Sequence, residues 1–143
     1  GDCGAATAGN YGAATAGDSG AATAGYSGAA TAGYSGAATA GDCGAATAGD
    51  CGAATAGNYG AATAGDCGAA TARGKALTGS NGLSVARGKN VQVKGGIGAI
   101  LVIAEERDDT YDIVDWKAVV VDGEVVKADT WYRLENGELV EVD

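Results

Sequence analysis

An eight-residue repeat governs the first half of the chain. From Gly1 to Ala72 the sequence consists of nine copies of G-x-x-G-A-A-T-A. Only the second and third positions vary, and they hold Asp-Cys, Asn-Tyr, Asp-Ser or Tyr-Ser. A strict short period indicates stacked units, each of which packs only against its neighbours. Copies this similar also indicate recent tandem duplication or deliberate design.

The repeat is incompatible with a helix. Each octad carries two glycines that cost about 1 kcal/mol apiece relative to alanine, and a period of eight does not match 3.6 residues per turn. Gly-rich sequence is otherwise typical of flexible linkers, but the strict period and the absence of Pro favour stacking. We therefore predict an all-β fold, a parallel β-solenoid in which Gly-x-x forms a corner and G-A-A-T-A a short strand. Because eight is even, side-chain alternation stays in phase.

This alternation also predicts which side chains point inward. In the degenerate octads after residue 72, we place Leu83 and Val85, and then Val91 and Val93, at the fourth and sixth positions. Because apolar side chains gather inside a coil, positions four, six and eight of every octad should point inward. The Ala and Thr residues at positions five and seven should then point outward.

Two octads per coil fit the small residues best. One eight-residue strand cannot fold back on itself, and three octads would enclose a space that Gly and Ala cannot fill. Coils of about 16 residues give a thin two-sheet solenoid, with its sheets closer than the usual ~10 Å. The nine octads make about 4.5 coils, which the degenerate pieces extend to about six, or roughly 29 Å at ~4.8 Å per coil.

The composition divides the chain into two domains. Residues 1–95 should form the octapeptide-repeat solenoid, regular over 1–72 and degenerate, with wider coils, over 73–95. The piece spanning 73–79 has seven residues rather than eight, so the repeat slips there. Residues 96–143 should form a C-terminal β cap domain, because an open coil edge invites aggregation. No such cap precedes the first octad, so we expect an N-terminal edge that pairs with another molecule.

The expected cap is an antiparallel β meander. Its strands are predicted over 97–104, 111–122, 124–134 and 138–143, with hairpin turns at Asp122-Gly123 and Asn136-Gly137. Both Trp residues and most large aliphatic residues lie in this segment, so the ordinary core should lie here. The predicted cap core consists of Trp116, Trp131, Val119, Val121 and Leu134.

Charge and hydropathy exclude two kinds of partner. The net charge of -9 is distributed as -5 over 1–72, +5 over 73–95 and -9 over 96–143. Nucleic acid needs a clustered basic surface, and the small basic band is expected to be a solvated surface instead. No apolar run approaches the ~20 residues of a membrane span. We expect neither nucleic acid nor a membrane as partner.

The octads GDCGAATA and GDSGAATA, together with the ending KADTWYRLENGELVEV, resemble the octapeptide-repeat solenoid proteins of bacterial and prophage genomes. Many repeats of that family resemble G-D-x-S-A-A-T-N, whereas here Gly replaces Ser and Ala replaces Asn. The resemblance implies a structural or surface element and transfers no catalytic residue. It also makes an extracellular or virion-associated location the expected one.

No catalytic arrangement emerges from the residues. The chain has no His, the usual general base near neutral pH and the commonest metal ligand. Its Ser, Cys and Asp residues have no base placed to activate a nucleophile. We predict that the protein is not an enzyme and has no cofactor-binding or metal-binding residues. The turn Asp residues are expected to be solvated rather than calcium ligands, and the turn Tyr residues to be surface aromatics or a carbohydrate-stacking surface.

Four cysteines occupy turn positions. With 16 residues per coil, Cys3, Cys51 and Cys67 should lie along one edge of the rod and Cys43 along the other. Cys51 and Cys67 are one coil apart, near 4.8 Å, which is within the Cα range of a disulfide. Free thiols are favoured, and a Cys51–Cys67 disulfide is the alternative.

Two rows of outward threonine are the candidate binding surface. They resemble the ice-binding faces of β-solenoid antifreeze proteins, although those carry two Thr per strand and here the outward pair is Ala-Thr. Thr is also a good strand former whose ladders stabilise a sheet, and this plainer interpretation is favoured. The rows are Thr7, Thr23, Thr39, Thr55 and Thr71 on one face and Thr15, Thr31, Thr47 and Thr63 on the other.

Together these features predict a non-catalytic structural or scaffold rod. It would be a fibre, surface or phage-associated element that forms a homo-oligomer through its N-terminal edge. The first alternative is an ice-binding or glycan-binding solenoid that uses the threonine rows. The second is an engineered model repeat protein, since the octads are uniform and the chain starts at Gly1 without any Met.

Overall fold

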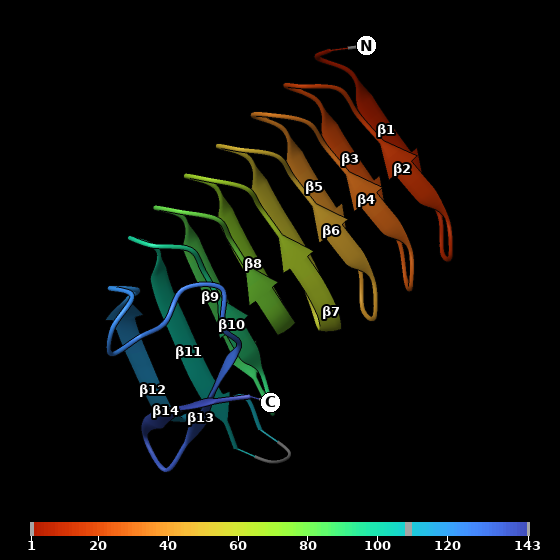
Figure 1. Cartoon of the computed structure of the whole chain (residues 1–143). Helices are drawn as coiled ribbons and strands as arrows, with labels where there is room; N and C mark the ends of the chain where they lie inside the picture. The colour runs from red at the N-terminus through yellow and green to blue at the C-terminus, as the bar shows by residue number, and fades with distance from the viewer. Residues whose placement is uncertain (1, 108–109, 143) are drawn as a thin grey trace.

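The computed structural model describes residues 2–107 and 110–142, and all regular structure in them is β (Figure 1). Ten strands belong to the first 94 residues and four follow them. The strands are β1 (Ala5–Ala8), β2 (Ala13–Thr15), β3 (Ala21–Ala24), β4 (Ala29–Thr31), β5 (Ala37–Ala40), β6 (Ala45–Thr47), β7 (Ala53–Thr63), β8 (Ala69–Leu77), β9 (Leu83–Gly88), β10 (Gln92–Lys94), β11 (Ile100–Glu106), β12 (Ile113–Val120), β13 (Tyr132–Glu135) and β14 (Glu138–Glu141).

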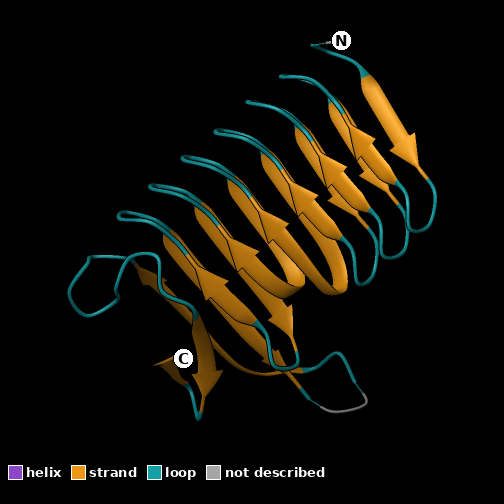
Figure 2. Cartoon of the chain, turned by 45° about the vertical axis from the view of Figure 1, so that its right-hand side comes forward, coloured by secondary structure: helices purple, strands orange, loops and turns teal. Residues whose placement is uncertain are grey.

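The repeats form a parallel β-solenoid of about six turns, as predicted. The Ala5–Ala8 strand pairs with Ala21–Ala24, and Ala13–Thr15 pairs with Ala29–Thr31, both parallel and shifted by 16 residues. One sheet therefore collects the odd-numbered octads and the other the even-numbered octads, with a corner between them. Figure 2 shows the coils stacked side by side along the rod.

The core of the rod is made of alanine. Position-six and position-eight alanines from Ala22 onward are 0–4% exposed, whereas in the first coil Ala14 alone is buried and Ala6, Ala8 and Ala16 are half-buried. The position-four glycine has no room for a side chain: a Cβ on Gly36 would lie 2.6 Å from the carbonyl oxygen of Gly20. Positions four, six and eight thus point inward, and the predicted alternation is confirmed for the regular octads.

Each corner is a tight turn closed by a hydrogen bond from the position-four N–H to the position-one carbonyl, at 3.1 Å for Gly12 and Gly9. At seven corners the third position has positive φ, as the i+2 residue of a type II turn requires. Only Asn81 among these seven residues is of a type that commonly adopts this conformation. The third-position residues with φ between 54° and 62° are Tyr11, Ser27, Cys43, Cys51, Tyr59, Cys67 and Asn81. The N–H groups of Ser19 and Ser35 instead donate to the preceding coil, at 2.7 and 2.8 Å.

The repeat slips at Arg73, as predicted, and the corner there is two residues short. Strand pairing changes from Ala56–Ala72, 16 residues apart, to Ala61–Lys75, only 14 apart. Leu83 then pairs with Ala69, an outward position, and is 39% exposed.

The prediction that Leu83 and Val85 point inward is therefore wrong. The octad runs over 79–86, which buries Ser84 instead. Ser84 Oγ donates to the Lys94 carbonyl at 2.7 Å and lies 2.9 Å from Thr78 Oγ1, so the buried hydroxyls are satisfied. Val91 and Val93 do point inward and are fully buried.

The solenoid ends in antiparallel strands that are divided between the two sheets. β11 still pairs parallel with β9, so the parallel stack continues beyond residue 95. β12 then pairs antiparallel with β11 on one sheet. The β13–β14 hairpin pairs antiparallel with β10 on the other sheet. The expected antiparallel strands are thus present, but they do not lie next to one another in a single meander.

The two predicted hairpin turns have different outcomes. Asn136-Gly137 connects β13 to β14 with φ of 51° and 81°, which confirms the turn. Asp122-Gly123 instead begins a loop, and the predicted strand over 124–134 is mostly wrong. The Asp122 carboxylate accepts hydrogen bonds from the N–H groups of Glu124, Val125 and Val126 at 2.9–3.0 Å. This side-chain cap stabilises the loop in place of a strand.

The predicted cap core is only partly correct. Val121 is buried, and Val119 and Leu134 pack half-buried against the core. Trp131 is half-buried at the surface. The prediction for Trp116 is wrong, because this side chain is 66% exposed on the outer face of β12. Leu101, Ile103 and Val91 fill the interior that Trp116 was expected to fill.

Candidate functional surfaces

Two threonine rows run along the outer faces of the rod. Thr7 pairs with Thr23 and Thr15 pairs with Thr31, and the same pairing continues coil by coil through Thr71 and Thr63. All of these side chains are exposed except the half-buried Thr63. The structure thus brings together each row that the sequence predicts. Each row lies beside a parallel row of outward alanines, so the outer face carries only small side chains at regular intervals.

Along the corners, the Asp and Asn residues at position two hydrogen-bond to the next coil. Asp50 Oδ1 accepts from the N–H of Asp66 at 3.0 Å, and Asp66 Oδ1 accepts from the N–H of Ser80 at 2.8 Å. Asp42 accepts from Asn58 in the same way on the opposite edge, at 2.8 Å. These carboxylates are therefore used in the stacking of the coils. In the described part of the chain no three His, Cys, Asp or Glu residues form a group that could hold a metal ion.

The four cysteines are exposed and free. Stacking places Cys51 and Cys67 at equivalent corners of successive coils, because the N–H of Cys51 donates to the Asp66 carbonyl at 2.9 Å. Cys3 and Cys43 have Ser19 and Tyr59 at the equivalent position of the next coil. Cys51 and Cys67 are thus the pair in which two thiols face each other across one coil step.

Tyrosines line the same corners. Tyr34 lies with its hydroxyl 3.8 Å from Cys51 Sγ, and the hydrogen bond and electrostatic interaction with Cys51 raise the pKa of Tyr34. Tyr26 has a raised pKa for the same reason beside Cys43. Tyr11 and Tyr26 meet edge to face with their ring centroids 5.9 Å apart. These rings lie on the surface, as expected, and cover the glycine-rich backbone.

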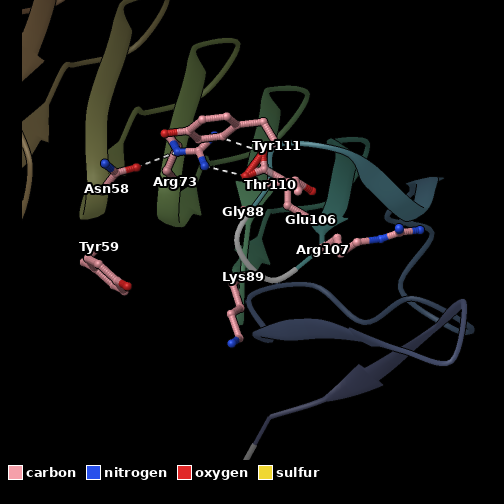
Figure 3. A pocket seen from close by; sticks show the side chains of 9 residues that line it. All are labelled: Asn58, Tyr59, Arg73, Gly88, Lys89, Glu106, Arg107, Thr110 and Tyr111. Carbon is pink, nitrogen blue, oxygen red and sulfur yellow. Dashed lines mark hydrogen bonds and ion pairs between the residues drawn. The ribbon is translucent and has the colours of Figure 1, made fainter.

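A charged pocket of about 650 Å³ lies where the repeat shortens, and the sequence did not predict it (Figure 3). Glu106, whose side chain is 4% exposed, forms ion pairs with Arg73 and Arg87. Arg73 also donates to Asn58 Oδ1 at 2.6 Å, and its guanidinium lies 5.4 Å from the ring centroid of Tyr111. Hydrogen bonds from Arg73 hold the pKa of the Glu106 carboxyl below its usual range.

The pocket is held together chiefly by its own charges. Both oxygens of the Glu106 carboxylate accept hydrogen bonds from the guanidinium groups of Arg73 and Arg87, so this buried carboxylate is paired. Glu106 lies 33 residues from Arg73 and 19 residues from Arg87 in the chain, so no local sequence pattern predicts these ion pairs. These ion pairs lie at the corner that is two residues short. They join β8, which carries Arg73, to β9, which carries Arg87, and to β11, which carries Glu106.

A second basic cluster lies on the other sheet. The Nζ atoms of Lys75 and Lys94 each lie 5.5 Å from the ring centroid of Trp131. The attraction of both ammonium groups to the ring offsets part of the repulsion between their like charges. Four of the five basic residues in the band of residues 73–95 are thus divided between this cluster and the Glu106 ion pairs, and the fifth, Lys89, lines the pocket.

The fold defines the chain as a parallel β-solenoid with a 16-residue coil and antiparallel terminal strands. Comparison with known proteins adds no relative: no family model, no curated protein and no solved structure matches the chain. No described segment forms a helix that is long and apolar enough to cross a membrane.

Proposed function

We propose that the chain is a non-catalytic scaffold rod, a fibre, surface or phage-associated element that assembles through its first coil. The observation that carries this proposal is the edge of that coil. In the described residues β1 pairs only with β3 and β2 pairs only with β4. One edge of each strand therefore has N–H and C=O groups without a strand partner, and such edges template pairing with another chain.

The groups at this edge follow from the pattern of the ladder. The N–H groups of Ala21 and Ala29 donate backward to the carbonyls of Gly4 and Gly12, at 3.0 and 2.9 Å. The equivalent N–H groups of Ala5 and Ala13 point the same way, toward solvent. No charged side chain in β1 or β2 opposes the approach of another strand.

Proline at Ala5 and Ala13 tests the assembly. It removes one outward N–H group from each edge strand without breaking the ladder to the next coil, because edge strands tolerate proline. Sedimentation velocity over a concentration series should show a larger assembly for the parent chain than for the Ala5→Pro/Ala13→Pro variant, in which the first coil no longer contributes. The Ala5→Ser/Ala13→Ser variant keeps both N–H groups and should assemble like the parent. A parent chain that stays monomeric at millimolar concentration would overturn the proposal.

A second candidate function is binding to an ordered surface, ice or glycan, through the threonine rows. The observation that favours it is the in-register pairing of Thr7 to Thr71 on one face. Thermal hysteresis of the parent chain tests the ice hypothesis. If the face of the odd-numbered octads binds ice, Thr39→Lys should abolish the thermal hysteresis. If the face of the even-numbered octads binds ice, Thr31→Lys should abolish it. Absence of hysteresis and of ice shaping at millimolar concentration removes ice as the ligand.

A further inference from the structure

The outer face of β12 is an unexplained apolar surface. Trp116 is 66% exposed, Val120 56% and Val114 51%, on a strand that among the described residues pairs only with β11. Ile100, which pairs with Val120 on β11, is also 44% exposed. A tryptophan this exposed on an edge strand is characteristic of a surface that another protein covers.

The charges within β12 identify the partner. Asp115 and Lys117 flank Trp116 and are the two charged residues of this strand. If two copies of β12 pair antiparallel with Trp116 opposite Trp116, Asp115 of each copy lies opposite Lys117 of the other. The same register places Val114 opposite Ala118 and Ile113 opposite Val119, so the pairs formed within residues 113–119 are all apolar or of opposite charge.

Neighbouring two-fold registers are unfavourable. A two-fold centre at Asp115 would place the two aspartates opposite each other, and a centre at Lys117 would do the same to the two lysines. Like charges directly opposite destabilise a strand pair. The edge of the other sheet contrasts with β12, because both charged residues of β14, Glu138 and Glu141, are acidic and cannot form a cross-strand pair of opposite charge with a second copy.

We propose that β12 is a dimerisation strand, which pairs antiparallel with β12 of a second copy of this chain about a two-fold axis at Trp116. The two β11–β12 sheets then form one continuous sheet across the dimer. The two tryptophans lie side by side on its outer face with Val120 and Ile100 beside them. This interface lies at the opposite end of the rod from β1, so it is independent of the proposed assembly through the first coil.

A pair of charge-reversed variants tests this interface. Both are made on the Ala5→Pro/Ala13→Pro background, so that first-coil assembly does not contribute to the measured mass. Asp115→Lys would place lysines opposite each other in a homodimer, and Lys117→Asp would place aspartates opposite each other. Each variant alone should be monomeric by light scattering. An equimolar mixture should form heterodimers, because both cross-strand pairs are again of opposite charge.

The mixture also controls for misfolding, since a misfolded chain would not regain a dimer when mixed. Lys117 forms an ion pair with Glu138 at 3.2 Å, so the circular dichroism of each variant is compared with that of the background chain. As a second readout, Trp131→Phe leaves Trp116 as the single tryptophan, and its emission should shift to shorter wavelength with increasing concentration. A background chain that stays monomeric, single variants that dimerise like it, or a monomeric mixture would each overturn the proposal.

Discussion

Arg73 and Glu106 meet across 33 residues of sequence at the one corner where the regular repeat loses two residues. The Glu106 side chain is nearly buried, whereas that of Arg73 is 33% exposed and that of Arg87 48% exposed. The carboxylate therefore depends on the two guanidinium groups, while both guanidinium groups still reach water.

Removing this carboxylate should destabilise the wide end of the rod. Glu106→Gln leaves two neighbouring arginines without their shared anion, and we expect a loss of about 1–3 kcal/mol in the free energy of unfolding. The partial exposure of both arginines keeps the loss below that of a fully buried pair. Urea denaturation measures it. Lys127→Gln removes a more exposed ion pair, the one with Glu141, and should change the stability much less than Glu106→Gln does.

The same carboxylate predicts the direction of a pH dependence. Its pKa is lowered in the folded chain, chiefly by the hydrogen bonds from Arg73. A lowered folded pKa gives stability that is complete above the unfolded value of about 4.3 and is lost as the pH falls through the folded pKa. Thermal unfolding between pH 7 and pH 3 should show this loss in the parent chain. The loss should be smaller in Glu106→Gln, and equal losses would contradict the role of Glu106.

The alanine core should not accept larger residues. Ala38 is 1% exposed between two sheets that are spaced for methyl groups. Ala38→Val adds two methyl groups there and should cost about 1–3 kcal/mol through overpacking. Thr39→Val, the next residue along β5, faces solvent and should be nearly neutral. A comparison of the two by urea denaturation checks the inward and outward assignment.

Oxidation should select one cysteine pair. Cys51 and Cys67 occupy equivalent corners one coil apart, at the ~4.8 Å strand spacing that a disulfide can span. With oxidised glutathione as the thiol–disulfide exchange partner, peptide mapping should find a Cys51–Cys67 bond and not bonds to Cys3 or Cys43. Cys67→Ser should leave Cys51 as a free thiol or a glutathione adduct. Intramolecular bonds distributed over all four cysteines would contradict the stacking.

The sequence predicted the solenoid because its period and alternation are both regular. An even period keeps Ala22 inside and Thr23 outside in every coil, and small residues leave room for only two thin sheets. The threonine rows, and the edges of the rod on which the cysteines lie, follow from the same count of 16 residues per coil. These predictions needed no information on contacts that are distant in the chain.

The remaining features depend on such contacts. The corner at Arg73 is two residues short, which cannot be counted from the sequence without knowing where Ala61 pairs, and the side assigned to Leu83 was wrong for this reason. β12 has apolar residues on both faces, so its pattern does not indicate which face is buried, and Trp116 was assigned to the wrong face. The Glu106 ion pairs join residues of three different strands, so no local pattern in the sequence predicts them.

The corners have a consequence for how sequence can vary in this rod. At the corners with positive φ, the variable third residue has nearly the same φ, 60° for Cys43 and 61° for Cys51, while the strands between the corners hold the fold. Equivalent corners of successive coils therefore recur about every 4.8 Å along the rod. Side chains placed at these corners would form a linear array. Their order is set by the amino-acid sequence and their spacing by the backbone.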